Sequence, residues 1–430
     1  TGHRSRAGSM KKRREALARQ NFPGAAAVRH EQMLDVAARH LNASGVSLTS
    51  LGDIAEVLGV SRAALYQYIE DREDLVFQCY RRSCEVMARH LGEAIRLGSD
   101  AADVVSLFIE RMLDPGQPEI ATRAEIAVLS QERQEIIQGL YDAIITRLAK
   151  VLADGADAGV LRPCDPTINA STLISLVTWT PLMPYWAPAS RVFSPQRIVD
   201  ALKAAVLDGL AVDRRSMPQY HTIDLSPLTT RVIGVFDRDA VMGAKRETLL
   251  AIASRLFNSK GIDSTSLEEI ASHVGATKRT LYHHLGDKQT LLARCYARAF
   301  RIFIYIMECM TTYPGTRVQA FAAAFHALSE AYLRDDLSPL APLVGHEALQ
   351  GETQAQMQPQ AAALSEGYMN ALFAGRNEGS MHAGDLVARL LLLPGFISWL
   401  VKDTGTHAKD RVDHIAREVS ALVCLGLRRV

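Results

Sequence analysis

Apolar residues recur along almost the whole chain at spacings of three and four, as Leu34 and Ala38 or Leu202 and Val206 illustrate. This spacing places one apolar stripe on the side of an α-helix that faces a core. The alternation typical of a β-strand occurs only weakly, at residues 230–236. The pattern therefore predicts an all-α protein.

The helical pattern occurs twice. Residues 31–82 align with residues 247–298 at a constant offset of 216, without a gap. The two segments share 19 identical residues in 52 positions, including Gly59 and its equivalent Gly275. Because the offset is half the length of the chain, it indicates a tandem duplication.

Behind these segments the two copies resemble each other less. Residues 159–162 echo residues 379–382, and Trp186 is matched with Trp399. Prolines and the lack of a helical period predict a linker between the copies. The predicted domains are a tag remnant with a basic N-terminal arm (1–28), a first front (29–82), a first helical back (83–211), the linker (212–244), a second front (245–298) and a second helical back (299–430).

Each front carries the signals of a helix, a tight turn and a second helix. In the first copy Ser50 can cap one helix, Gly59 suits its left-handed end, and Ser61 can cap the next helix. The second copy repeats these signals, and Ser266 with Glu269 forms a capping box. Two helices joined in this way predict a helix-turn-helix, whose second helix enters the major groove of DNA.

The outward residues of the second helix are the candidates for contacting DNA. Arginine pairs with guanine, glutamine pairs with adenine, and alanine contacts only a thymine methyl group. Cap hydroxyls and tyrosines suit phosphates instead. The candidates are Ser61, Arg62, Ala63, Ala64, Tyr66, Gln67 and Tyr68 in the first copy, and Thr277, Lys278, Arg279, Thr280, Tyr282, His283 and His284 in the second.

Residues 49–75 and 265–291 resemble the DNA-binding signature of the TetR family of transcriptional regulators. The resemblance implies two TetR-like units, each a three-helix helix-turn-helix domain followed by a helical ligand-binding and dimerisation domain. It also implies that the caps of the first motif helix, Ser50 and Ser266, contact phosphates. We call the two helix-turn-helix domains the first head (29–82) and the second head (245–298).

The resemblance extends to a basic residue behind the second motif helix, Arg72 in the first copy and Lys288 in the second. In the family this residue binds a phosphate. The sequence departs from the signature at Ile69 and Leu285, where phenylalanine is usual, and this is a change within the core. Glu70 is a second departure, because it places an acidic side chain near the expected phosphates of the first head.

The resemblance also implies an effector site in the backs. Apolar stripes predict helices there at 104–112, 120–130, 135–153, 168–179, 197–210, 318–333, 340–349, 361–374, 386–400 and 412–427. Large side chains on or near these helices are candidates for the wall of an apolar pocket, namely Trp179, Met183, Trp186, Phe325, His326, Phe396 and Trp399. The competing interpretation is that they fill a closed core, and both interpretations stay open.

A regulator of this family pairs two identical chains, and a duplicated chain can make the same pairing with itself. The linker could reach roughly 100 Å if it were extended. Tethering raises the effective concentration of the halves towards the millimolar range. The sequence therefore predicts a single-chain pseudo-dimer, and whether the chain also forms homodimers stays open.

Composition and charge narrow the function further. The net charge is only +1, so contact with double-stranded DNA must rely on a local basic surface. Residues 166–190 lack charged side chains but contain four prolines, which favours a buried segment over a membrane span. The six cysteines show no zinc or disulfide spacing. We expect a cytoplasmic protein without a cofactor or a metal.

Two other function classes fit the sequence less well than a DNA-binding regulator. An enzyme is disfavoured because the chain contains no nucleotide-binding, zinc-protease or nucleophile-elbow motif. The second alternative is a regulator with one vestigial head that acts mainly through a partner protein. Caps, turn glycines and basic residues occur in both heads, and they favour binding of a DNA operator by both heads. The resemblance implies that a small apolar effector releases the operator.

Overall fold

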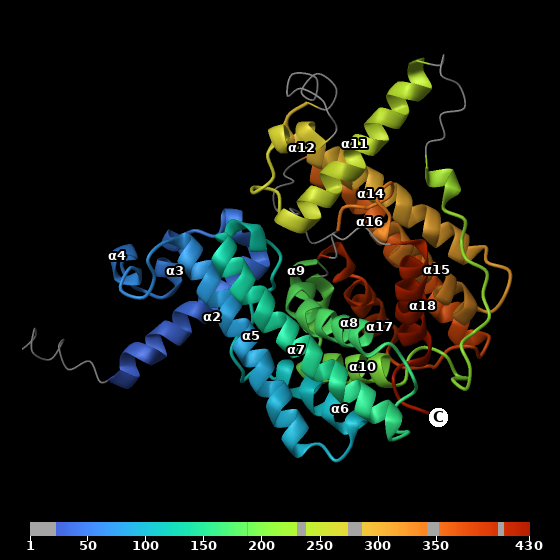
Figure 1. Cartoon of the computed structure of the whole chain (residues 1–430), viewed down its shortest axis with the longest axis horizontal. Coiled ribbons are helices and arrows are strands. Elements are labelled where there is room, and N and C mark those ends of the chain that lie inside the picture. The colour runs from blue at the N-terminus through green and yellow to red at the C-terminus, as the bar shows by residue number, and fades with distance from the viewer. Residues whose placement is uncertain (1–22, 187, 230–237, 274–285, 342–351, 403–407) are drawn as a thin grey trace, which may run out of the picture.

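The computed structural model describes residues 23–186, 188–229, 238–273, 286–341, 352–402 and 408–430. Within these ranges the chain is helical, and β-structure is limited to two isolated bridges, so the all-α prediction is confirmed (Figure 1). The first copy contains α2 (Pro23–Leu48), α3 (Leu51–Val57), α4 (Arg62–Leu65), α5 (Arg72–Leu97), α6 (Ala101–Met112), α7 (Gln131–Asp157), α8 (Pro166–Trp179), α9 (Met183–Trp186) and α10 (Pro195–Leu207). The second copy contains α11 (Arg238–Lys260), α12 (Leu267–His273), α14 (Lys288–Thr311), α15 (Arg317–Leu333), α16 (Glu352–Asn377), α17 (Leu386–Leu392) and α18 (Lys409–Leu425).

The predicted helix at 120–130 is wrong, because side chains satisfy its backbone groups. Only the short 3-10 turn η1 (Ile126–Val128) forms there. Asn42 of α2 donates through Nδ2 to the carbonyl of Ile120 at 2.8 Å, and its Oδ1 accepts the N–H of Thr122 at 2.9 Å. Backbone groups that a helix would pair internally are paired with α2 instead.

The second copy uses the same arrangement. Asn258 of α11, the repeat equivalent of Asn42, donates to the carbonyl of Pro339 at 2.9 Å and accepts the N–H of Ala341 at 2.8 Å. The predicted helix at 340–349 therefore does not begin at its expected start. The rest of that helix lies outside the described residues.

The predicted helix at 386–400 is also shorter than expected. It ends as α17 at Leu392 and continues in the 3-10 turns η5 (Leu393–Phe396) and η6 (Leu400–Lys402). Pro394 lies at the start of η5 and has no N–H to continue an α-helical ladder. The weak strand signal at 230–236 lies outside the described part of the chain.

The two backs pack together about a pseudo-two-fold axis. α8 of the first copy packs on α18 of the second, and their equivalents α17 and α10 pack in the same way. The N–H of Arg162 donates to the carbonyl of Leu427 at 2.8 Å, and at the equivalent place the N–H of His382 donates to the carbonyl of Leu210 at 2.9 Å. The two halves therefore form an intramolecular pseudo-dimer.

Two ion pairs follow the same symmetry. Asp165 caps α8 and lies 3.0 Å, from Oδ2 to Nε2, from His414 of α18. Asp385 caps α17 and pairs with Arg197 of α10. Each N-cap thus forms an ion pair with the helix of the opposite copy that crosses it.

The positions of the helix caps show which tryptophans of the two copies are equivalent. Asp165 and Asp385 are equivalent caps, at an offset of 385 − 165 = 220. The same offset relates Trp179 to Trp399, because 399 − 179 = 220. Trp399 is therefore the equivalent of Trp179, and matching it with Trp186 was wrong.

The helices α10 and α18 meet at their C-terminal ends through two glycines. Gly209 has φ of 65° and Gly426 has φ of 66°. A Cβ on Gly209 would overlap the carbonyl oxygen of Cys424, and a Cβ on Gly426 would overlap the carbonyl oxygen of Leu207. Backbone contacts backbone here, which requires residues without side chains.

The described part of the predicted linker, 212–244, packs on the second copy, and α11 begins within its last residues. The hydroxyl oxygen of Tyr220 lies 3.0 Å from Nδ1 of His326 on α15. Tyr305 of α14 donates its hydroxyl to the carbonyl of Asp224 at 2.7 Å. This stretch follows the outer edge of the second copy (right side of Figure 1) and is not a free tether. No described helix is long and apolar enough to cross a membrane.

Candidate nucleic-acid interface

The first head presents α3 and α4 at one end of the molecule (Figure 1). Ser50 caps α3, and its Oγ accepts the N–H of Gly52 at 3.0 Å. Leu51 and Ile54 bury the inner face of α3, so the opposite face is left to solvent. Ser50 is exposed at the start of this helix, and its hydroxyl is accessible.

The turn behind α3 depends on Gly59, which has φ of 65°. Ser61 then caps α4, with its Oγ accepting the N–H of Ala64 at 3.3 Å. Leu65 is 2% exposed and anchors α4 in the core of the head. α4 is a single helical turn, shorter than the sequence predicts, and the chain continues as a turn through residues 66–68.

Most of the predicted DNA-contacting side chains of the first head lie on its outer surface. Tyr66 is 48% exposed, a high value for a large aromatic side chain, and this leaves it free to contact a partner. The exposed candidates are Ser50, Ser61, Arg62, Ala63, Tyr66, Gln67 and Arg72, whereas Ala64 and Tyr68 are half-buried. Contact with DNA stays a prediction for each of them.

Tyr68 is held by two side chains that sequence reasoning missed. Its ring stacks on His30 of α2, with ring centroids 5.8 Å apart and planes 9° apart. Gln78 of α5 donates through Nε2 to the carbonyl of Tyr68 at 3.0 Å, and its Oε1 lies 2.6 Å from Nε2 of His30. His30 therefore fixes the end of the recognition segment and leaves Tyr68 little free surface.

Arg72 is the first residue of α5 and is exposed. The helix is capped by Asp71, whose Oδ1 accepts the N–H of Asp74 at 2.8 Å. Glu70 is exposed next to this cap and donates its own N–H to Oδ2 of Asp74 at 3.1 Å. The predicted phosphate-binding arginine thus has acidic neighbours, as the sequence indicates.

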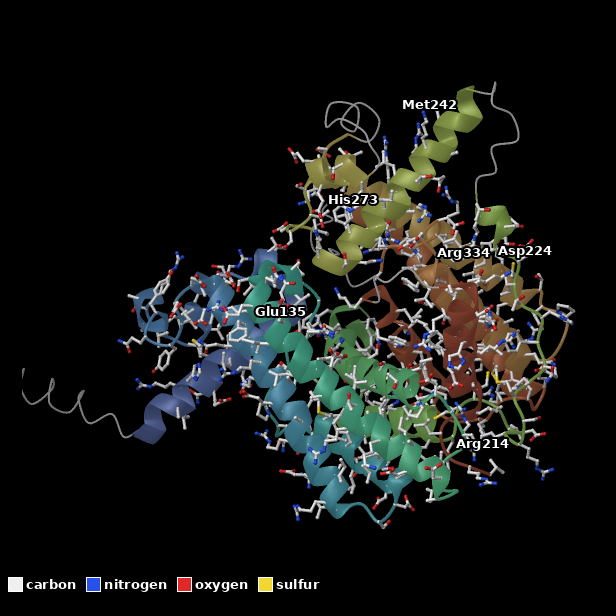
Figure 2. All side chains as sticks on the ribbon, viewed as in Figure 1. Glu135, Arg214, Asp224, Met242, His273 and Arg334 are labelled. Carbon is white, nitrogen blue, oxygen red and sulfur yellow. The ribbon has the colours of Figure 1, made fainter. Side chains whose placement is uncertain are left out.

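The second head repeats this frame where the structure describes it. The Oγ of Ser266 accepts the N–H of Glu269 at 3.0 Å, and His273 is the last described residue of α12 (Figure 2). Lys288 begins α14 and donates through Nζ to the carbonyl of Asp263 at 3.4 Å, and burial lowers its pKa. The other candidates lie outside the described residues, namely Thr277, Lys278, Arg279, Thr280, Tyr282, His283 and His284.

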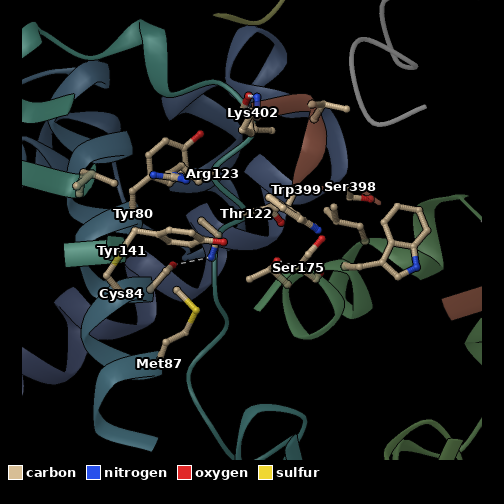
Figure 3. Close-up of a pocket in the computed structure, with 18 of the residues that line it drawn as sticks. Tyr80, Cys84, Met87, Thr122, Arg123, Tyr141, Ser175, Ser398, Trp399 and Lys402 are labelled. Atoms are coloured by element: carbon tan, nitrogen blue, oxygen red, sulfur yellow. Dashed lines mark hydrogen bonds between the residues drawn. The ribbon is translucent and has the colours of Figure 1, made fainter. Parts of the chain in front are cut away.

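A cavity of about 80 Å³ lies where the first copy meets the second (Figure 3). It is bounded by α5, α7, α8 and residues 121–124 of the first copy, and by residues 398–402 of the second. Trp179 and Trp399, two of the predicted pocket residues, line it. Lys402 and Arg123 also line it and were not predicted, because nothing in the sequence places these two residues together.

The other predicted pocket residues do not line this cavity. Phe325 and Phe396 pack edge to face in the core, with ring centroids 6.0 Å apart. His326 is buried and bonded to the linker, burial lowers its pKa, and Met183 is buried. The core interpretation therefore describes these four residues, whereas the side chain of Trp186 lies outside the described part of the chain.

The described residues form neither a metal site nor a disulfide. No group of three His, Cys, Asp or Glu there is arranged to hold a metal ion. All six cysteines are unpaired thiols. The equivalent Cys79 and Cys295 are buried against the heads, and burial raises the pKa of each thiol to about 12. Both side chains are packed within the cores of the heads.

The profile described as "Bacterial regulatory proteins, tetR family" matches the chain twice, at residues 33–79 and 249–295. A second profile, "Tetracyclin repressor-like, C-terminal domain", matches residues 64–210. The chain belongs to the tetR family. It is therefore a DNA-binding transcriptional regulator that carries two heads of this family in a tandem duplication.

Relatives of the tetR-family chain are transcriptional regulators. The uncharacterized HTH-type regulator YhgD of Bacillus subtilis is 21% identical over 191 residues, covering 43% of this chain and 98% of its own. The regulator AcrR of Shigella flexneri is 27% identical over 165 residues, which cover 37% of this chain and 77% of AcrR. The solved structure of the regulator PfmR from Thermus thermophilus has a TM-score of 0.36 at 22% identity, covering 42% of this chain and 99% of its own.

Proposed function

We propose that this regulator is a repressor that binds one operator with both heads of one chain. The observation that carries the proposal is the intramolecular pseudo-dimer, in which α8 and α10 of the first copy pack on α18 and α17 of the second. Two heads joined through such an interface have a defined separation. One chain therefore supplies what two chains supply in an ordinary dimer.

A small, largely apolar effector bound in the back domains would release the operator. A ligand changes DNA affinity only when it favours one arrangement of the two heads over another. The cavity between the copies supports this mechanism, because its walls come from both halves of the molecule. A molecule bound there contacts both halves at once.

The operator should be an imperfect palindrome. Arg62, Ala63 and Gln67 stand in the first head where Lys278, Arg279 and His283 stand in the second. Different side chains read different base edges, so the half-sites should differ in sequence while their spacing stays near one helical turn. Selecting binding sites from random DNA measures this, and a perfectly symmetric consensus contradicts it.

The stoichiometry tests the proposal most directly. Sedimentation of the protein with DNA from upstream of its own gene should give one chain per operator. A gel shift with each half-site alone should show much weaker binding. If only one half-site is required, the second head is vestigial and the regulator acts through another partner. If the free protein is a tight dimer through α8, α10, α17 and α18, the single-chain arrangement is wrong.

A further inference from the structure

The cavity between the copies is apolar along most of its wall and also carries two cations, Lys402 and Arg123. Met87 lies at one end in Figure 3, and Ile137 and Leu182 add further apolar surface. Lys402 lies at the opposite end, and Arg123 lies between them over the ring of Tyr141, 3.9 Å from its centroid. An apolar chamber with a cationic end suits a molecule with a hydrocarbon tail and an anionic head.

Lys402 is a cation that has no close anion among the described residues. Its Nζ donates to the carbonyl of Ala124 at 2.5 Å and to the carbonyl of Asn258 at 2.7 Å. Burial lowers its pKa to about 8, and the nearby Glu125 opposes this change only in part. Glu125 is engaged elsewhere, since its Oε2 accepts the N–H of Val46 at 2.5 Å. An incoming carboxylate would complete the pairing of this ammonium group.

The indole N–H of Trp399 is a second unused donor. Its Nε1 is buried and has no hydrogen-bond partner among the described residues. The symmetry-equivalent Trp179 does use its indole, donating through Nε1 to the carbonyl of Leu391 at 2.7 Å. A buried donor without an acceptor is costly, so a ligand oxygen that reached it would be bound favourably.

We propose that this cavity binds a small carboxylate with a short hydrocarbon tail, held at its head by Lys402 and Trp399. The tail would lie towards Met87. The volume of about 80 Å³ is smaller than the roughly 150 Å³ apolar cavity that accepts benzene, so the carboxylate and its tail together have no more than about six non-hydrogen atoms, and the tail has about two or three carbons. This proposal names the effector class of the proposed function, and only its coupling to DNA rests on that function.

The position of Lys402 explains how binding of such a ligand in the cavity would affect the two heads. Asn258 belongs to α11 of the second head, whereas Ala124 precedes Glu125, which contacts the first head at Val46. Glu125 also touches the second head, since a Cβ on Gly261 would lie 2.8 Å from its Cγ. Lys402 therefore links the second head, through the carbonyl of Asn258, to residues 124–125, which contact the first head at Val46. A carboxylate that drew its ammonium away would loosen that junction and change the separation of the heads.

Titration calorimetry of the full-length protein without DNA tests the site. The probes are propanoate and butanoate, with pentanoate as an oversized probe and butanamide as a neutral control. We expect the best carboxylate to bind with a Kd between about 10 μM and 1 mM, and butanamide to bind more weakly. Lys402→Met should weaken carboxylate binding at least about tenfold, because a hydrogen bond to a charged group is lost.

Two matched variants separate recognition from folding. Lys150→Met removes an exposed lysine of α7 that pairs with Asp154, and it should bind as the wild type does. Trp399→Phe keeps an aromatic wall but removes the N–H, and it should weaken binding about threefold to tenfold. This variant decides the matter if Lys402→Met fails to fold. Binding unchanged in Lys402→Met or in Trp399→Phe, or no saturable binding by any carboxylate, overturns the site.

The pH dependence gives a second readout. Lys402 must be protonated to hold the anion, so affinity should be level from pH 6.5 to 7.5 and fall as pH rises through about 8. Burial raises the pKa of Cys84 to about 11 and of Tyr141 to about 12, and it also raises the pKa values of Tyr80 and Glu125. The thiol and the two phenols therefore stay neutral across this range. An affinity that is constant up to pH 9.5 contradicts the role of Lys402.

Operator binding tests the coupling separately. Saturating carboxylate should lower operator affinity at least about tenfold in the wild type and much less in Lys402→Met. A carboxylate that binds the free protein but leaves operator affinity unchanged overturns the coupling. If the protein binds no operator even without ligand, the proposed function fails, while calorimetry still decides whether the cavity takes a carboxylate.

Discussion

Gly426→Ala should lower the free energy of unfolding by about 3 kcal/mol or more. Gly426 has φ of 66° and ψ of −163°, a conformation that side chains rarely allow. An added Cβ would also overlap the carbonyl oxygen of Leu207 across the pseudo-two-fold axis. Because backbone lies on both sides, no side-chain rotation relieves the overlap. Urea unfolding followed by circular dichroism measures the loss.

Gly59→Ala is the matched control for this substitution. Gly59 also has a positive φ, but a Cβ there would meet no atom within 4 Å. It should therefore cost only the backbone strain, about 1–2 kcal/mol. Gly209→Ala should behave like Gly426→Ala, since its Cβ would overlap the carbonyl oxygen of Cys424. Equal losses in Gly59→Ala and Gly426→Ala would show that the close approach of α10 and α18 is not essential.

Arg62→Ala should weaken operator binding by about 1–3 kcal/mol and relax the sequence requirement in one half-site only. Arg62 is exposed at the start of α4 in the first head. The equivalent position of the second head is occupied by Lys278. Arg72→Ala should instead weaken binding to all sequences alike and reduce the salt slope by about one, because a phosphate contact is lost. Fluorescence anisotropy on operators with one altered half-site measures both effects.

Arg96→Ala controls for the loss of a positive charge. Arg96 is exposed in the last turn of α5, 96 − 72 = 24 residues beyond Arg72. At 1.5 Å per residue this places it about 36 Å along the helix from Arg72. It should leave operator affinity unchanged. Arg62→Ala that relaxes both half-sites equally would mean that two chains, each using its first head, bind the operator.

Local signals in the sequence predicted most of the frame of the heads. Ser50, Gly59 and Ser61 are short-range signals, since caps and left-handed turns depend on residues within one helical turn. The structure places each in the predicted role. The non-helical backbone at residues 120–125 could not be predicted in this way, because it depends on Asn42, about 80 positions earlier in the chain.

The residues of the cavity were even harder to predict from the sequence, because they come from distant parts of the chain. Trp179 and Trp399 were predicted as pocket residues because large aromatic side chains favour cavities and cores alike. Lys402 was missed, although it is the main cation of the cavity, because its partners Ala124 and Asn258 lie far from it in the sequence. The pseudo-two-fold pairing of the copies brings these three residues together, and no periodicity within one copy contains that information.

Fusing the two halves into one chain frees the regulator from the symmetry of a homodimer. In a homodimer every substitution appears twice, so each effector site and each recognition surface has an identical twin. Here Lys402 has one position in the molecule, and its cavity between the copies is made from unlike halves. Effector titrations should therefore follow a simple hyperbola with one molecule per chain. Each head is also free to accumulate its own substitutions, so evolution can change one half of the operator while the other half stays as it was.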